Sequence, residues 1–252
     1  MTDRALARRL DVELSVISPS GPGGSITKAD VERVAEVLAA AGPFEELKGV
    51  RRAMARNMTL SGSEVVPASV TEEADVDDWP KDSDITVRLA RAIVAGVAAE
   101  PALNAWYDSQ KNGRRINQRV DLGIAVDSAD GLFVPVLRDV ANRDATDLRT
   151  GLDAMMADVK ARTVPAAELR GQTITLSNFG TMAGIFGTLV VVPPQVAILG
   201  AGRLHEKVVA REGAAQVRRI LPLSLSFDHR VVTGGEASRF LAAVKADLEQ
   251  AE

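Results

Sequence analysis

The chain of 252 residues contains no cysteine and only two histidines, His205 and His229. The absence of cysteine excludes disulfide bonds, cysteine-ligated zinc and a cysteine nucleophile. Two histidines far apart in the sequence argue against a histidine-rich metal site within one chain, so no metal is expected. Aromatic residues make up only 4% of the chain, so Val, Leu, Ile, Ala and Met must fill its core.

An excess of charge of one sign and a long apolar run are also missing. The 30 basic and 34 acidic residues give a net charge of −4, and the basic pairs Arg8-Arg9, Arg51-Arg52 and Arg114-Arg115 are too short for a nucleic-acid-binding surface. No apolar run approaches the roughly 20 residues of a membrane span. The N-terminus, MTDRALARRL, lacks the apolar segment of a signal peptide. The sequence therefore predicts a cytoplasmic protein with neither nucleic acid nor membrane as a partner.

Residues 1–40 have the pattern of a small helical module. ALARRLDVEL predicts a short helix, and VISPSGPGGSI predicts a loop. Thr27 and Asp30 form a variant of the capping box. They open a second helix whose apolar face is expected to contain Val31, Val34, Ala35 and Leu38. So small a unit is typical of a binding module. Residues 41–47 are interpreted as a linker to a second domain, 48–252.

The second domain alternates helices and strands. Apolar residues at helical spacing predict helices around 49–58, 85–100, 148–159 and 237–248. Alternating or continuous apolar segments predict strands at 121–127, 131–139, 172–178, 195–202 and 221–228. The sequence therefore predicts an α/β (α+β two-layer) domain, with a mixed sheet flanked by long helices.

His229 is the first candidate for catalysis. It closes an alternating strand and precedes VVTGGEASRF, a turn into a helix, where clefts commonly form. A neutral imidazole there can accept a proton from a thiol. The alternative is a histidine that only caps the strand with a hydrogen bond.

Ser177 is the second candidate. It ends a strand on the polar side, next to the turn Asn178-Phe179-Gly180. Its hydroxyl can donate a hydrogen bond to an oxyanion. The alternative is a serine that caps its own turn.

Several segments, in one order, carry a resemblance to a known family. DHRVVTGGEASRFL resembles the His-Arg-x-x-Asp-Gly motif of the dihydrolipoamide acyltransferases, the core components of 2-oxo acid dehydrogenase complexes. GVRRAMARNM, EPALNAWYD, LGIAVDSADGLFVPVLRD, LRGQTITLSNFG and VVPPQVAILGAG are similar to further blocks of that family. GPGGSITKADV resembles its peripheral subunit-binding domain. The resemblance covers almost the whole chain.

The resemblance implies a chloramphenicol-acetyltransferase-like fold in trimers, which often assemble further into a cubic or dodecahedral core. It implies an active site between subunits, where coenzyme A (CoA) and a lipoyl group enter from opposite sides as substrates. The residue matching His229 deprotonates the CoA thiol, and the hydroxyl matching Ser177 stabilises the oxyanion. The 2-oxo acid dehydrogenase and dihydrolipoamide dehydrogenase components are the expected partners.

The chain departs from the family pattern at position 233. Thr233 stands where the motif has aspartate, which in the family forms an ion pair with an arginine of the opening helix, here Arg51. Threonine supplies no charge, so Arg51 would need another partner. We expect the site to keep its function with a different supporting structure, in which Asp228 and Arg230 orient the loop.

The lipoyl domain and the module also depart from the pattern. Lys28 lies at a helix start, not at a hairpin tip that could carry a lipoyl group. No covalent cofactor is therefore expected here, and another domain or chain must supply the lipoyl group. Pro19 and Ser25 replace the glycine and arginine common in relatives, which puts docking of the partner enzymes in question.

The resemblance and its departures lead to one interpretation with two alternatives. The main interpretation is acyl transfer between dihydrolipoamide and CoA. The first alternative is a weakly active or inactive scaffold of such a complex, and the second is a free-standing acyltransferase of the chloramphenicol type. Structural or surface roles are expected for His205, Trp79, Trp106 and Tyr107.

Overall fold

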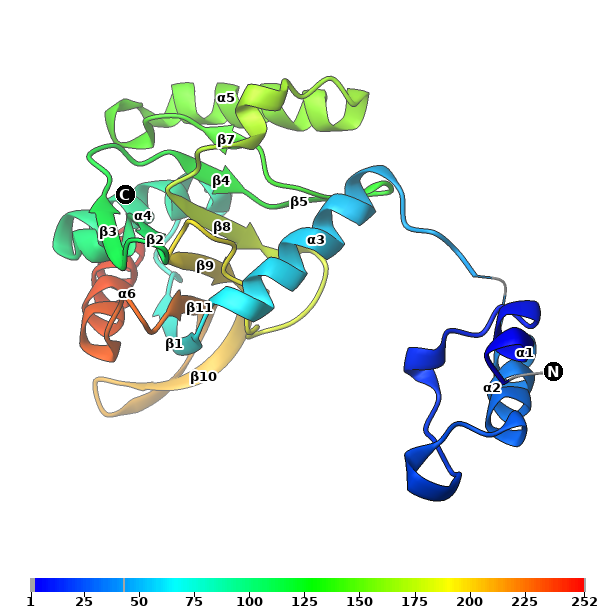
Figure 1. The fold of residues 1–252 in the computed structure, drawn as a ribbon. Helices are drawn as coiled ribbons and strands as arrows, with labels where there is room; N and C mark the ends of the chain where they lie inside the picture. The colour runs from blue at the N-terminus through cyan, green and yellow to red at the C-terminus, as the bar shows by residue number, and fades with distance from the viewer. Residues whose placement is uncertain (1–2, 43, 252) are drawn as a thin grey trace. The chain divides into compact units, whose positions relative to one another are not determined.

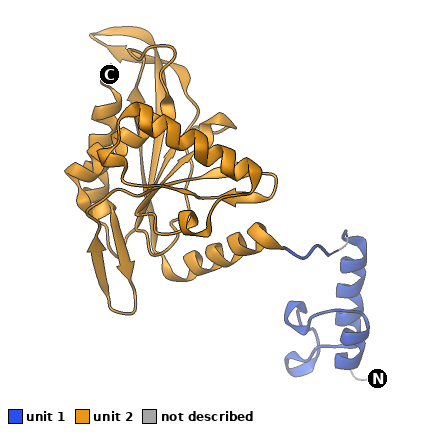
Figure 2. Cartoon of the chain, turned by 90° about the horizontal axis from the view of Figure 1, so that it is seen from above, with its two compact units in different colours: residues 1–47 blue, residues 48–252 orange. Residues whose placement is uncertain are grey.

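The chain forms two compact units, residues 1–47 and residues 48–252 (Figure 2). The structure, a computed structural model, describes residues 3–42 and 44–251. Within these ranges, no helix has both the length and the apolar character needed to cross a membrane.

Unit 1, residues 1–47, is built on two helices, α1 (Asp3–Arg9) and α2 (Lys28–Ala40), with 3-10 turns at Leu14–Val16 and Pro22–Gly24. The predicted capping box is confirmed, because Asp30 N donates to Thr27 Oγ1 and Thr27 N donates to Asp30 Oδ2. The small core consists of Leu6, Ala7, Val12, Ile17 and Val31. The prediction that Leu38 faces this core is wrong: Leu38 is 48% exposed, since the core reaches only the first half of α2.

Unit 2, residues 48–252, contains a mixed sheet, as predicted. Its strand order is β1-β11-β9-β8-β4-β7, with β10 paired to the first half of β11. β8 runs parallel to β4 and β9, while the other pairs are antiparallel. Two small sheets, β2-β3 and β5-β6, lie beside it. The strands are β1 (Pro67–Asp75), β2 (Ala105–Asp108), β3 (Gly113–Ile116), β4 (Leu122–Ile124), β5 (Val126–Ser128), β6 (Gly131–Phe133), β7 (Val136–Leu137), β8 (Ile174–Asn178), β9 (Ala197–Ala201), β10 (His205–Arg211) and β11 (Ala214–Asp228).

Helices cover the sheet of unit 2 (Figure 1). α4 (Ile85–Ala99) and α6 (Gly234–Leu248) pack against each other and against one face, and α5 (Ala145–Ala161) lies beside β5 and β7. α3 (Gly49–Glu64) crosses the other face. The apolar faces predicted for α5 and α6 are confirmed, because these residues are all buried: Leu148, Leu152, Met155, Val159, Ala237, Leu241, Val244 and Leu248. Short 3-10 turns occur at Pro101–Leu103, Val140–Asn142, Ala166–Leu169 and Phe179–Thr181.

The two strands predicted at 121–127 and 131–139 are divided between two sheets. β4 and β7 belong to the main sheet, whereas β5 and β6 form a separate pair. Pro135 lies at the division: it has no N–H, and its carbonyl accepts from Ile124 N at 2.9 Å. Ala125 N instead donates to Leu176 O at 2.9 Å. The prediction of one continuous strand through 121–127 is therefore wrong.

Gly96 lies where α4 and α6 approach each other most closely. A Cβ atom at Gly96 would lie 2.7 Å from Val244 Cγ2 and 2.8 Å from Phe240 Cε2, and both side chains are fully buried. We expect Gly96→Ala to lower the free energy of unfolding by about 1–3 kcal/mol through overpacking. Thermal or urea unfolding measures the change.

Gly62→Ala is the matched control. Gly62 lies in α3, and a Cβ atom added there would have no contact within 4 Å. It is expected to raise stability by about 0.5–1 kcal/mol, the usual gain of alanine over glycine in a helix. Equal effects of the two substitutions would contradict a tight α4–α6 contact.

Candidate active site

His229 lies in a short loop between the end of β11 and the start of α6, which we call the His229 loop (Asp228–Thr233). Its backbone N–H donates to Val66 O at 2.8 Å. The imidazole is exposed, and its ring centroid lies 5.6 Å from that of the buried Phe227. The backbone is thus fixed to the main sheet, while the side chain is open to a ligand.

The buried carboxylate of Asp228 anchors the base of the loop. Asp228 is 2% exposed, and its Oδ2 lies 2.7 Å from Arg230 Nη2. Its Oδ1 also accepts from Arg230 N at 3.1 Å. This side-chain hydrogen bond with Asp228 raises the pKa of Arg230 above its ordinary value. The two residues are therefore held together at the start of the loop.

Thr233 is the N-cap of α6. Its Oγ1 accepts from Glu236 N at 3.3 Å and donates to Glu236 Oε2 at 2.8 Å, and Thr233 N donates to the same oxygen at 2.7 Å. The backbone hydrogen bond from Thr233, helped by the hydroxyl, holds the pKa of Glu236 below its ordinary value. Thr233 therefore completes a capping box and supports the loop without a charge.

Arg51 does not reach Thr233 within one chain. It lies in the first turn of α3 and is exposed, and its side chain forms no hydrogen bond or ion pair with any residue in 3–42 or 44–251. Val66, which holds His229, follows the other end of α3. Fifteen residues of mostly helical chain separate Arg51 from Val66, which is about 20 Å.

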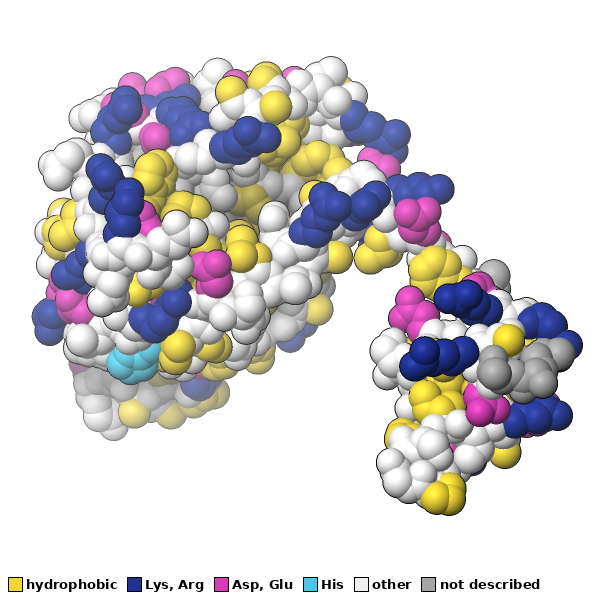
Figure 3. Space-filling model, viewed as in Figure 1, with side chains coloured by type: hydrophobic (Ala, Val, Ile, Leu, Met, Phe, Trp, Pro, Cys, Tyr) yellow, Lys and Arg dark blue, Asp and Glu magenta, His cyan; other side chains and the backbone are white. Residues whose placement is uncertain are grey.

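Ser177 lies near the end of β8, in the wall of a cavity of about 430 Å³. α3 forms another wall through Val50, Met54 and Met58. Apolar side chains gather in the hollow beside α3 (Figure 3). Thr175 Oγ1 donates to Gln195 Oε1 at 2.6 Å within the cavity.

The Ser177 hydroxyl is not used to cap its turn. The following 3-10 turn, Phe179–Thr181, has no side-chain cap, and Ser177 Oγ forms no hydrogen bond within the part of the chain that the structure describes. Ser177 is half-buried. Its hydroxyl is therefore available to donate to a ligand in the cavity.

Ser177 and His229 are far apart in one chain. In the sheet, Ser177 is level with Gly200 of β9, which is level with Ser224 of β11. His229 lies five residues beyond Ser224, or about 16 Å along the strand. It is also displaced across the sheet, and it is absent from the cavity wall. One chain therefore does not bring the two candidates together.

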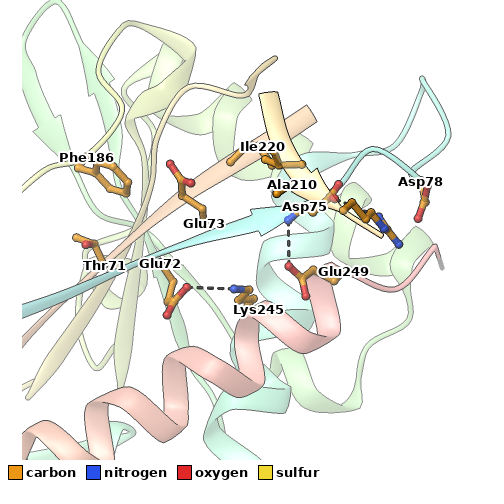
Figure 4. Close-up of a pocket in the computed structure, with 12 residues that line it drawn as sticks. Thr71, Glu72, Glu73, Asp75, Asp78, Phe186, Ala210, Ile220, Lys245 and Glu249 are labelled. Atoms are coloured by element: carbon orange, nitrogen blue, oxygen red, sulfur yellow. Dashed lines mark hydrogen bonds and ion pairs between the residues drawn. The ribbon is translucent and has the colours of Figure 1, made fainter. Parts of the chain in front are cut away.

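A second hollow, of about 600 Å³, lies between β1, β10 and the end of α6 (Figure 4). Its acidic side chains are largely paired: Lys245 Nζ lies 3.1 Å from Glu72 Oε2, and Arg211 Nη1 lies 3.2 Å from Asp75 Oδ2. It contains neither candidate. The described residues also hold no cluster of three or more His, Cys, Asp or Glu that could bind a metal.

The remaining histidine and aromatic residues have structural positions. His205 begins β10, a strand that was not predicted from the sequence, and its Nδ1 lies 3.0 Å from Arg203 O. Trp79 is buried and donates from Nε1 to Leu248 O at 2.6 Å. Trp106 donates from Nε1 to Gln172 O at 2.9 Å, and the Tyr107 ring lies 4.8 Å from Arg230 Cζ. The predicted packing role of Trp79 is confirmed.

Comparison with known proteins gives two family matches. Residues 43–252 match the family described as 2-oxoacid dehydrogenases acyltransferase (catalytic domain), and residues 4–32 match the e3 binding domain. The lipoamide acyltransferase component of the branched-chain alpha-keto acid dehydrogenase complex of Pseudomonas aeruginosa is 34% identical over 98% of this chain and 64% of its own length. The chain thus spans less than two thirds of that relative.

Solved structures agree with the family matches. The cubic core of a pyruvate dehydrogenase multienzyme complex has a TM-score of 0.78 at 27% identity, covering 84% of this chain and 94% of that one. The dihydrolipoamide acetyltransferase of Azotobacter vinelandii has a TM-score of 0.76 at 27% identity with the same coverage. Chloramphenicol acetyltransferase shares the fold, with a TM-score of 0.51 at 14% identity over 82% of this chain and 99% of that one. The predicted fold class is confirmed, and the chain belongs to the family of 2-oxoacid dehydrogenase acyltransferases.

Proposed function

We propose that this protein transfers acyl groups between dihydrolipoamide and CoA, with His229 as general base and Ser177 as oxyanion stabiliser. The unbonded Ser177 hydroxyl in the wall of an apolar cavity is the observation that carries the proposal. Hydrogen-bond donors that face a water-poor site stabilise developing negative charge most strongly.

The chemistry needs one base and one donor. His229 takes the proton of the CoA thiol, because a thiol near its ordinary pKa of about 8.5 is a weak nucleophile. The CoA sulfur then bonds to the acyl carbon of the thioester, and the carbonyl oxygen becomes an oxyanion that accepts from Ser177 Oγ. When the carbon–sulfur bond to dihydrolipoamide breaks, His229 returns the proton to the departing sulfur.

A related enzyme supports these two roles. Crystallographic and enzymatic work on the A. vinelandii acetyltransferase addressed a serine, a histidine and an asparagine in its mechanism, separated by 52 positions and then by four. Ser177, His229 and Thr233 have the same two separations. Threonine at the third position keeps a hydroxyl that bonds within the loop.

We infer that the site forms between two chains of a trimer. Ser177 and the cavity belong to one end of the sheet and His229 to the other, so a single chain offers two half-sites. Cyclic symmetry repeats the same contact around the oligomer, so each chain gives its Ser177 half to one neighbour and its His229 half to the other. Arg51 lies beside the cavity half, since its neighbour Val50 lines the cavity.

The cavity favours an uncharged, apolar acyl group. Among the described residues that line it, none is charged. A succinyl carboxylate would lose hydration there without a cationic partner. The P. aeruginosa relative is named for a branched-chain alpha-keto acid complex, and branched acyl groups are uncharged and apolar. CoA and the lipoyl group act as substrates here, and another domain or chain supplies the lipoyl group.

The partners follow from the two matched domains. We propose that unit 1, which contains the e3 binding match over residues 4–32, docks the dihydrolipoamide dehydrogenase component or the 2-oxo acid dehydrogenase component. Unit 2 resembles a chain of a cubic core, and we propose that trimers of it form the core of such a complex. Measured binding of purified dihydrolipoamide dehydrogenase to the full chain tests the role of unit 1.

The test of the activity is acyl transfer from a panel of acyl-CoAs to dihydrolipoamide. His229→Ala is expected to lower kcat by about 100- to 10,000-fold, the usual contribution of a general base. Ser177→Ala is expected to lower it by about 100- to 1,000-fold. His205→Ala is the control, because it removes the other histidine and is expected to leave kcat unchanged.

Two outcomes would contradict the proposal. Wild-type protein without turnover of any acyl-CoA would support the scaffold alternative. Turnover that survives His229→Ala and Ser177→Ala would place the chemistry elsewhere. A preference for succinyl-CoA would contradict only the assignment of the acyl group.

A further inference from the structure

The β2-β3 hairpin contacts the His229 loop at two points. Tyr107 of β2 and Arg114 of β3 are cross-strand partners, so their side chains project from the same side of the hairpin. The Tyr107 ring lies under Arg230, 4.8 Å from its Cζ atom. Arg114 Nη1 donates to Val231 O at 2.9 Å. The hairpin therefore contacts two consecutive residues of the loop, directly after His229.

Arg114 also connects the loop to the first turn of α6. Its Nη1 lies 3.8 Å from Glu236 Oε1, while Glu236 Oε2 accepts from the backbone and hydroxyl of Thr233. The Arg114 side chain is 36% exposed and that of Glu236 is 19% exposed. Solvent screens the ion pair between Arg114 and Glu236 at this exposure. The shorter hydrogen bond from Arg114 to Val231 O is therefore the contact that fixes the position of the loop.

The loop has one fixed end beside His229 and one beside Thr233. Asp228 and Val66 hold the first end, and the capping box of α6 holds the second. Val231 lies between them, and Arg114 is the side chain that holds its carbonyl. Thr233 supplies no charge and Arg51 does not reach it within one chain, whereas Arg114 brings a cation to the loop from another element, the hairpin.

We propose that Arg114 is a positioning residue for His229 and that, within one chain, the β2-β3 hairpin supplies a cation that orders the His229 loop. This inference rests on the proposed function of His229. Because the contact of Arg114 is with the backbone of the loop, its effect is expected on the rate of the chemical step and not on substrate binding. A displacement of a base by about 1 Å is enough to reduce the rate strongly.

Arg114→Gln tests the inference, with Arg115→Gln as its matched control. Arg115 is the next residue of β3 and is exposed, and its side chain forms no hydrogen bond or ion pair with any residue that the structure describes. Arg114→Gln is expected to lower kcat by about tenfold or more, with the KM of both substrates and the melting temperature unchanged. Arg114→Lys, which keeps the charge and a donor, is expected to recover most of kcat, and Arg115→Gln to match the wild type.

Hydrogen exchange gives a readout that does not depend on activity. The amides of Val231 and Val232 both donate to Asp228 O at 3.0 Å. We expect them to exchange at least tenfold faster in Arg114→Gln, and at the wild-type rate in Arg115→Gln. If the wild type transfers no acyl group, the proposed function fails, and the exchange rates alone decide whether the hairpin orders the loop.

Three results would overturn the inference. The first is wild-type kcat in Arg114→Gln together with unchanged exchange. The second is a loss of kcat that accompanies a lower melting temperature, because that indicates a general structural role. The third is an equal effect of Arg115→Gln, because that indicates a nonspecific effect of charge on the hairpin.

Discussion

A 1:1 mixture of Ser177→Ala and His229→Ala chains, unfolded and reassembled together, is expected to regain about one quarter of the wild-type acyl-transfer activity, because in the proposed trimer each site takes its two residues from different chains. Random assembly makes about three quarters of the trimers mixed, and each mixed trimer has one of its three interfaces with both residues intact. The steady-state rate per chain measures the recovery. Each variant alone is expected to retain about 1% or less.

The complementary mixture is the control. Wild-type chains reassembled with Ser177→Ala/His229→Ala double-variant chains are expected to retain about one quarter of the activity if sites form between chains, and about one half if they form within one chain. A mixture of the two single variants that shows no more activity than its separate components would contradict a shared site. Ser177 and His229 would then have to approach each other by a rearrangement within one chain.

The sheet register is the physical reason for this expectation. β8 and β9 run parallel and β11 runs antiparallel to them. The carboxyl end of β8 therefore lies at one end of the strands of the sheet, and the carboxyl end of β11 lies at the opposite end. Ser177 is next to the last residue of β8, and His229 follows the last residue of β11. The local position of each residue was predictable from strand parity, but the direction in which their strands run depends on long-range pairing.

Secondary structure was most predictable where one face of an element is buried. The apolar faces of α4, α5 and α6 repeat at helical spacing because each packs on the sheet or on a neighbouring helix. β1 and β10 were not predicted from the sequence because only one residue of β1 and none of β10 is buried. Glu72 and Glu73 give β1 a polar pattern, and its position is fixed by pairing with β11, which no local pattern reports.

The support of the site was less predictable than the site itself. The sequence indicated that Asp228 and Arg230 orient the loop, and the structure places both in contact. In the sequence, Arg114 is only half of a short basic pair. Its contact with Val231 joins positions 117 residues apart, and an arginine on an exposed strand carries no sequence signal for such a contact.

Asp30→Asn is expected to unfold unit 1 while unit 2 keeps its wild-type melting temperature. Asp30 is fully buried. It accepts from Ser20 Oγ at 2.7 Å, Thr27 N at 2.9 Å and Ser20 N at 3.0 Å, and it pairs with Arg33. An amide has one oxygen in place of two, so buried donors lose their partner, which is costly in so small a core. Limited proteolysis of the full chain measures the change, with rapid cleavage expected within 1–47 only.

The pH dependence of unit 1 tests the same carboxylate without a mutation. The hydrogen bond from the Ser20 hydroxyl, followed by those from Thr27 N and Ser20 N, lowers the pKa of Asp30 far below its ordinary value. A group with a lowered pKa in the folded state stabilises that state above its unfolded pKa of about 3.9, and this stabilisation is lost as the pH falls below that value. Unit 1 of the wild type is therefore expected to lose stability below about pH 4.

Glu32→Gln is the matched control for Asp30→Asn. It removes one charge from an exposed pair with Lys28 on the same helix, and it is expected to leave proteolysis of unit 1 at the wild-type rate. Equally rapid proteolysis of unit 1 in Asp30→Asn and Glu32→Gln would show that helix charge, and not the buried carboxylate, holds unit 1 together.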